Sequence, residues 1–248
     1  MKFEFVPLLH LQRDFYTLPR GPERFRTYLE TLLNADASDV EFMPLVVMNP
    51  MGKEHIAQTL DTLLAMDADA IAAQAIATIS EQFEDNVSPF KLGLVVVDDL
   101  KGGWTNRYTT EFSARFELKA SLRRRWLTVI LWASETPTQQ TVCEATLTTV
   151  YRLAYIQKYG FACTLQDMMR QEGYAMARAG CQQPKLEAED LTYTREVIKP
   201  YLETQNYPII LSCLFGDVAA QTLGYVPQGL SNSAGLALAL HDAQHPKT

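Results

Sequence analysis

The sequence predicts an α+β fold, in which a small antiparallel β-meander at about 91–134 packs with several α-helices. Three strand-like runs follow one another there, at about 91–99, 106–117 and 124–134. Helical patterns come before them, and the C-terminal half of the chain is rich in helices. Because strands and helices are segregated along the chain, we expect an α+β protein rather than a repeated β-α-β fold.

The three runs predict strands for different reasons. The run at 91–99 is dominated by valine and leucine, and the run at 124–134 is apolar on both faces, which indicates buried strands. The run at 106–117 alternates in polarity, as a half-buried strand does. Its apolar face holds Tyr108, Phe112, Ala114 and Phe116, and its polar face holds Arg107, Thr109, Glu111, Ser113, Arg115 and Glu117.

Hydrophobic residues spaced three and four apart predict helices on both sides of this region. Before it, helices are expected at 22–34, with Pro22 in the first turn, at 52–66 and at about 67–83, while the run at 40–48 is expected to be extended. After it, helices are expected at 136–159, 164–179 with Thr164 as the cap, 187–204, 217–223 and 231–242. The apolar run at 207–215 is expected to be a buried helix, with a strand as the alternative. No linker rich in Pro, Gly or Ser interrupts the chain, so we expect a single domain over residues 1–248.

The composition excludes several classes of protein. With 47% hydrophobic and 21% charged residues in 248, the chain is typical of a globular protein with a sizeable core. A formal net charge of −7 argues against a partner that is nucleic acid. The four cysteines form no C-x-x-C pair, so we expect neither a zinc or redox motif nor a disulfide. Without a signal-peptide pattern or a long apolar run, we expect a cytoplasmic protein with no membrane partner.

The main candidate site lies in the segment VVVDDLKGGWTNRYTTEF, at 95–112, where a buried strand ends in two aspartates. Asp98 or Asp99 would act as the acid or base, or as a ligand of Mg²⁺. Two adjacent carboxylates on a strand point in opposite directions, so one can face the interior while the other meets solvent. The alternative is a hairpin loop that ends an ordinary solvated sheet face.

Five further residues of this segment complete the predicted site. Arg107 and Lys101 would hold an anionic group, because guanidinium and ammonium groups donate charged hydrogen bonds. Asn106 adds a neutral donor, and Trp104 would exclude water. Glu111 would orient Arg107 from the same face of the predicted strand, as the second member of a row of alternating charge.

A second candidate is the turn VVMNPMGKEH, at 46–55, where Lys53 stands at the start of a predicted helix. Free backbone N–H groups at a helix start can receive an anion, although the Walker spacing is absent. His55 would carry a proton there, and the alternative is a plain turn with a surface histidine. If this turn and the loop at 98–107 met in space, the case for an anion site would become much stronger.

Other patterns fall short of a functional motif. His241 and His245 have the spacing of two ligands on one helix face, but they lie at a terminus and lack the H-E-x-x-H form. The chain has no G-x-G-x-x-G fingerprint for a dinucleotide. We therefore expect no metal site and no cofactor, and Mg²⁺ at the aspartates has no ligand set to support it.

Two functions remain open at this point. The first is an enzyme or a ligand-binding protein for a small anionic or zwitterionic molecule, with its site at the 98–111 loop. The alternative is a non-catalytic protein that binds a partner or forms a homo-oligomer. Its contact surface would be the C-terminal helices or a tyrosine stripe formed by Tyr151, Tyr155 and Tyr159, which recur every four residues on one helix face.

Overall fold

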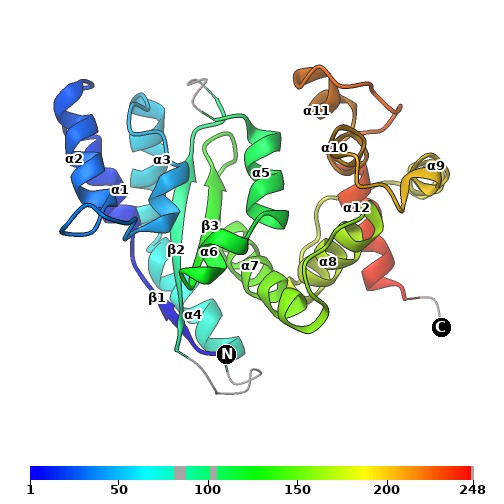
Figure 1. Cartoon of the computed structure of the whole chain (residues 1–248), viewed down its shortest axis with the longest axis horizontal. Helices are drawn as coiled ribbons and strands as arrows, with labels where there is room; N and C mark the ends of the chain where they lie inside the picture. Colours follow the sequence, from blue (N-terminus) through cyan, green and yellow to red (C-terminus); the bar gives the residue numbers. More distant parts are fainter. Residues whose placement is uncertain (81–87, 101–104, 247–248) are drawn as a thin grey trace. The chain divides into compact units, whose positions relative to one another are not determined.

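The protein contains a three-stranded parallel sheet, as Figure 1 shows. This computed structural model describes residues 1–80, 88–100 and 105–246. The strands are β1 (Phe3–Phe5), β2 (Phe90–Val97) and β3 (Trp126–Trp132), and they lie in the order β1-β2-β3. Both pairings are parallel, with Phe3 opposite Phe90 and the longer β2–β3 ladder extending to Val97 opposite Trp132.

The predicted antiparallel meander is therefore wrong. The first and third runs are strands, β2 and β3, but they run in the same direction. The middle run forms helix α5 (Arg107–Phe116) instead of a strand. Its aromatic residues Tyr108, Phe112 and Phe116 are four apart, a spacing that matches both the two-residue period of a strand and one turn of a helix.

Two local interactions stabilise α5 as a helix. The side-chain oxygen of Asn106 accepts a hydrogen bond of 3.1 Å from the backbone N–H of Thr109, which is the usual capping geometry at a helix start. Glu111 and Arg115, one turn apart, form an ion pair of 2.5 Å. The row of alternating charge predicted for a strand face is thus a helical ion pair. Parallel strands need a crossover, and α5 with α6 (Lys119–Arg123) provides it.

The chain divides into two compact units. Unit 1 comprises 1–110 and 118–149, and unit 2 comprises 111–117 and 150–248. The single domain expected over 1–248 stays a prediction, because a compact unit need not fold independently. In unit 1 the sheet is accompanied by α1 (Leu9–Phe15), α2 (Pro22–Leu32), the 3-10 helix η1 (Met43–Val47), α3 (Glu54–Ala65), α4 (Ala68–Ser80), α6, and parts of α5 and α7 (Gln139–Tyr159).

Among the described residues of unit 2, all regular secondary structure is helical. Its helices after α7 are α8 (Leu165–Ala179), α9 (Ala188–Ile198), η2 (Lys199–Tyr201), α10 (Tyr207–Phe215), α11 (Asp217–Thr222) and α12 (Ala234–Gln244). The predicted C-terminal helices are confirmed, including the cap of α8, where Thr164 and Asp167 form a reciprocal capping box. The extended run expected at 40–48 is wrong, since Pro44 occupies the first turn of η1.

The core of unit 1 surrounds β2. Leu92, Leu94, Val95 and Val97 on this strand are inaccessible to solvent. Beyond the short β1, the side chain of Gln12 on α1 continues the pairing, donating to the Val96 carbonyl at 2.7 Å and accepting from the Val96 N–H at 2.9 Å. The buried strand therefore reaches its last residue with these backbone groups satisfied.

All four cysteines are free, which confirms the expected absence of disulfides. Of the helices that the structure describes, none alone is long and apolar enough to cross a membrane. The pair α3 and α4, bent by 55°, reaches that length and composition only together.

Unit 2 contains a buried carboxylate, Glu172 on α8, which is inaccessible to solvent. Arg152 binds it through two hydrogen bonds, of 2.6 and 2.9 Å, and Arg115 forms a second ion pair with it. Burial alone would raise the pKa of Glu172, but the charges of Arg152 and Arg115 outweigh burial and lower it to about 2. Since Glu111 also pairs with Arg115, the two acids and two bases neutralise each other.

We predict that Glu172→Gln destabilises the protein by about 3–5 kcal/mol at pH 7, because it leaves buried Arg152 and half-buried Arg115 without their shared partner. The folded pKa of Glu172 lies below the ordinary value of 4.5, so its contribution is complete above that pH and is lost as the pH falls toward 2. Urea denaturation as a function of pH should show a flatter dependence in this window for the variant. The exposed Glu203→Gln is the control and should match wild type.

A second prediction concerns the contact between α8 and α12. A Cβ atom at Gly173 would lie 2.4 Å from the carbonyl oxygen of Ala239, so the two helices meet backbone to backbone. Gly173→Ala should lower the free energy of unfolding by about 1–3 kcal/mol, the usual cost of overpacking. Gly21→Ala, where nothing lies within 4 Å of the added atom, is the matched control. Equal denaturation midpoints for the two variants would contradict the close contact.

Candidate functional site

The candidate site lies at the carboxyl end of β2, where Asp98 follows the last residue of the strand. Open parallel sheets commonly bind ligands at the carboxyl ends of their strands. Asp98 is 2% exposed, so its carboxylate is buried at this edge. The loop after β3 reaches the same edge with Ser134, which donates two hydrogen bonds to the carboxylate of Asp99. Parallel pairing of β2 with β3 thus gathers polar side chains from two loops.

The carboxylate of Asp98 joins the two candidate segments that the sequence left apart. Its Oδ1 lies 2.9 Å from His55 Nε2 and accepts a bond of 3.1 Å from the backbone N–H of Leu100. Its Oδ2 accepts a bond of 3.2 Å from Asn49 Nδ2. The turn at 46–55 and the loop after β2 therefore meet in space, within unit 1. This is the convergence that strengthens the case for an anion site.

Asn49 is itself held in place by two hydrogen bonds. Its side-chain oxygen accepts from the Met51 N–H at 3.0 Å, and its carbonyl accepts from the Tyr16 hydroxyl at 2.6 Å. Burial is the main cause that raises the pKa of Tyr16, and the nearby negative charge of Asp98 adds to it. Tyr16 therefore stays a neutral donor, and the chain Tyr16–Asn49–Asp98 fixes the position of the carboxylate.

The geometry selects one tautomer of the neutral His55 ring. A carboxylate only accepts hydrogen bonds, so the Nε2 that faces Asp98 must carry the proton. The lone pair is then on Nδ1, a buried atom that has no hydrogen-bond partner among the residues the structure describes. A histidine held by a buried carboxylate through one nitrogen, with the other nitrogen unused, has the arrangement of a general base.

Asp99 belongs to a separate network of hydrogen bonds and ion pairs with Ser134, Arg107 and Glu135. Its carboxylate accepts bonds of 2.9 and 2.6 Å from the backbone and hydroxyl of Ser134, and one of 3.0 Å from Arg107 Nη1. Arg107 also pairs with Glu135, and its guanidinium lies 4.8 Å from the centre of the Trp132 ring. The positive charge of Arg107 is therefore already paired within the protein, where it stabilises the loop after β3. This pairing reduces the capacity of Arg107 to bind an external anion.

The remaining predicted site residues are dispersed. Lys101 and Trp104 lie outside the described residues. Asn106 caps α5, and Glu111 pairs with Arg115 in unit 2. Lys53 is exposed immediately before α3, two residues from His55.

The sequence did not indicate the roles of Asn49 and Tyr16. For His55 it left two interpretations open, a proton carrier or a surface residue in a plain turn. No spacing in the sequence connects these positions with Asp98, because His55 lies 43 residues and Asn49 lies 49 residues before it along the chain. Within the ranges that the structure describes, no group of three His, Cys, Asp or Glu side chains could hold a metal ion.

Comparison with known proteins adds little to this site. No family model matches the chain, and no solved structure matches it. The chain is similar to the uncharacterized protein YjfC of Bacillus subtilis (strain 168), with 31% identity over 80 residues. The match covers 32% of this chain and 27% of YjfC, so the chain spans about a quarter of the length of that relative. The function must therefore be argued from the site.

We predict that the neutral ring of His55 carries its proton on Nε2. Long-range ¹H–¹⁵N correlation spectra distinguish the two ring nitrogens and should show Nδ1 as the unprotonated one. Asp98→Asn replaces an obligatory acceptor by a side chain that can also donate, so the preference for this tautomer should fall. The exposed His10 in the same protein is the internal control and should be unaffected. A dominant Nδ1–H form in wild type would contradict the assignment.

Proposed function

We propose that the protein is an enzyme or ligand-binding protein that takes a small anionic or zwitterionic molecule at the carboxyl end of β2. The observation that carries the proposal is the His55–Asp98 pair, with a carboxylate side chain that is 1% exposed and an imidazole Nδ1 without a described partner. Such a pair is suited to receiving a proton from a bound molecule and returning it.

Asp98 acts as a positioning residue. Its oxygens accept from Asn49, Leu100 and His55, so its role is to orient the ring and to stabilise the imidazolium that forms when Nδ1 takes a proton. Positioned general bases contribute about 10²–10⁴-fold to a rate. His55, whose side chain is 14% exposed, is the catalytic candidate.

The start of α3 supplies an element suited to negative charge. In the described structure no side chain caps this helix, whose first turn contains His55. Backbone N–H groups and the helix dipole at such a start favour an anion, and exposed Lys53 adds a positive charge beside it. An anionic group bound there would place the rest of the molecule close to the imidazole.

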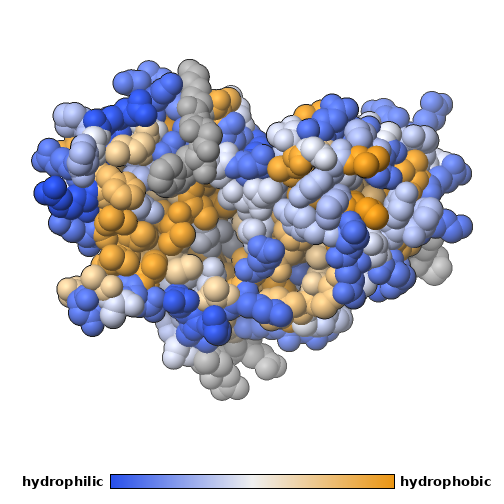
Figure 2. Space-filling model, turned by 45° about the horizontal axis from the view of Figure 1, so that its top comes forward, coloured by the Kyte–Doolittle hydropathy of each residue, from blue (hydrophilic) through white to orange (hydrophobic). Residues whose placement is uncertain are grey.

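Exposed apolar side chains support the alternative, a non-catalytic interaction protein. Phe25 and Leu29 on α2 and Val46 on η1 are 36%, 38% and 43% exposed. Figure 2 shows hydrophobic side chains gathered within unit 1 on the face that it displays. The tyrosine stripe is less suitable as a contact surface, because Tyr151 is only 6% exposed. Exposed apolar areas of several hundred Å² commonly mark contact surfaces.

The test is a thermal-shift screen with inorganic phosphate, phosphate monoesters, carboxylates and amino acids. A ligand at about 100 times its dissociation constant adds about 2.7 kcal/mol, which raises the melting temperature by several degrees. We expect a ligand whose effect is strongly reduced in both His55→Asn and Lys53→Ala. His10→Asn, at an exposed position of α1, is the matched control and should respond as wild type does. The site would be refuted if every ligand that stabilises wild type stabilised both His55→Asn and Lys53→Ala to the same extent.

A further inference from the structure

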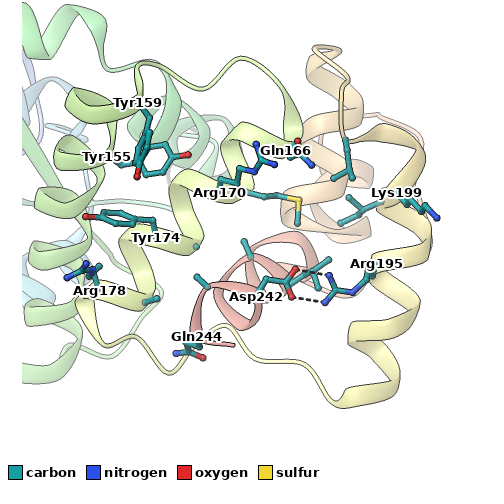
Figure 3. A pocket seen from close by; sticks show the side chains of 18 residues that line it. Tyr155, Tyr159, Gln166, Arg170, Tyr174, Arg178, Arg195, Lys199, Asp242 and Gln244 are labelled. Carbon is teal, nitrogen blue, oxygen red and sulfur yellow. Dashed lines mark hydrogen bonds and ion pairs between the residues drawn. The ribbon is translucent and has the colours of Figure 1, made fainter. Parts of the chain in front are cut away.

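Unit 2 has a groove of about 1130 Å³ that is separate in residues from the site described above. Figure 3 shows it lined by the end of α7 and by α8, α9 and α12, all within unit 2. Small-molecule sites typically have volumes of about 300–1,000 Å³, so the groove can hold a ligand of that size.

The apolar part of the groove lining, which we call the floor, includes side chains of α8, α9 and α12. Met169 and Ala177 on α8, Ile198 on α9, and Leu238 and Ala239 on α12 contribute to it. Its shape depends on the backbone contact between α8 and α12 at Gly173, because a larger residue there would separate the two helices. The floor offers apolar area without hydrogen-bonding groups, which suits the body of an organic molecule rather than a bare ion.

One wall of the groove is aromatic. The ring of Tyr155 lies 4.7 Å from that of Tyr159 and 5.5 Å from that of Tyr174, measured between ring centres. Figure 3 shows these three rings gathered on one side. Tyr159 is 58% exposed, which is a large value for an aromatic side chain, so its ring is accessible to a ligand. Such rings bind flat molecules by stacking or by edge contacts.

The groove is positively charged, in contrast to the chain as a whole. Four cationic side chains line it against one acid, Asp242, so its formal charge is +4 − 1 = +3, while the chain carries −7. Arg195 and Asp242 neutralise each other through two bonds of 2.7 and 2.6 Å. Arg170, Arg178 and Lys199 form no ion pair with any residue that the structure describes. In Figure 3, Arg170 lies between the tyrosines and Lys199.

We propose that this groove binds a small anion that carries a flat aromatic ring. The tyrosine wall and the apolar floor receive the ring, and Arg170 receives the anionic group, with Lys199 as a second cation. Each half of the ligand has its own partner, so neither a ring without charge nor a small inorganic anion makes the full set of contacts. The inference stands apart from the function proposed for His55, because the two sites share no residue and belong to different units.

Calorimetric titration with four probes tests this proposal. Phenyl phosphate and adenosine 5′-monophosphate carry both features, adenosine carries only the ring, and inorganic phosphate carries only the charge. A charged hydrogen bond is worth about 1.5–3 kcal/mol and a stacked ring about 1–3 kcal/mol, so each partial probe should bind at least about tenfold more weakly than the better complete probe.

Two substitutions test the cationic part and the aromatic part of the groove independently. Arg170→Ala should weaken the complete probes by about tenfold or more and leave adenosine unchanged. Tyr174→Leu should weaken the complete probes and adenosine and leave phosphate unchanged. Lys185→Ala removes an exposed cation of unit 2 outside the groove. It is the charge-matched control for Arg170→Ala and should bind as wild type does.

Three results would overturn the proposal: no binding of either complete probe at millimolar concentration, phosphate binding as tightly as phenyl phosphate, or affinities insensitive to both Arg170→Ala and Tyr174→Leu. Circular dichroism and the denaturation midpoint confirm that each variant is folded before it is titrated. His55→Asn distinguishes this groove from the site in unit 1. Binding that is lost in His55→Asn but kept in Arg170→Ala belongs to the site in unit 1, so failure of one proposal does not count against the other.

Discussion

The parallel pairing of β2 with β3 is the constraint on which the candidate site depends. The two strands run in register from Lys91 opposite Trp126 to Val97 opposite Trp132, so both end at one edge of the sheet. Asp98 and Asp99 leave one strand there, and the loop with Ser134 leaves the other. An antiparallel pair would have placed the end of one strand beside the start of the next, and these side chains would lie at opposite edges. The chemistry at the site thus follows from strand direction.

Each unit contains a buried carboxylate, and the partners differ in a way that separates structure from chemistry. Glu172 is neutralised by Arg152 and Arg115, which keep their charge at every pH relevant to the protein. Asp98 is paired with His55, and an imidazole can act as an acid or a base in a reaction. A carboxylate whose partner is permanently charged has a structural role, whereas a carboxylate beside an imidazole can support proton transfer.

Local patterns predicted most of the helices, but the sheet and the site depended on contacts between distant residues. Thr164 and the residues after it specified α8 because a capping box is complete within four positions. Helix α5 was missed because Phe112 and Phe116 satisfy the strand and helix periods equally, and β1 is only three residues long. The apolar run before Asp98 predicted its place at the end of a buried strand, yet its pairing with His55 required the fold to bring together residues 43 positions apart.

Gln12 has a consequence for the behaviour of the protein in solution. Because β1 ends at Phe5, the edge of β2 beyond it would expose the backbone N–H and C=O of Val96, and the amide of Gln12 covers both. Unpaired groups along a strand as apolar as Val95 to Val97 would form a template for another chain. The position of α1 therefore prevents this edge from pairing with a strand of another chain. Displacement of α1 would expose the edge and favour aggregation.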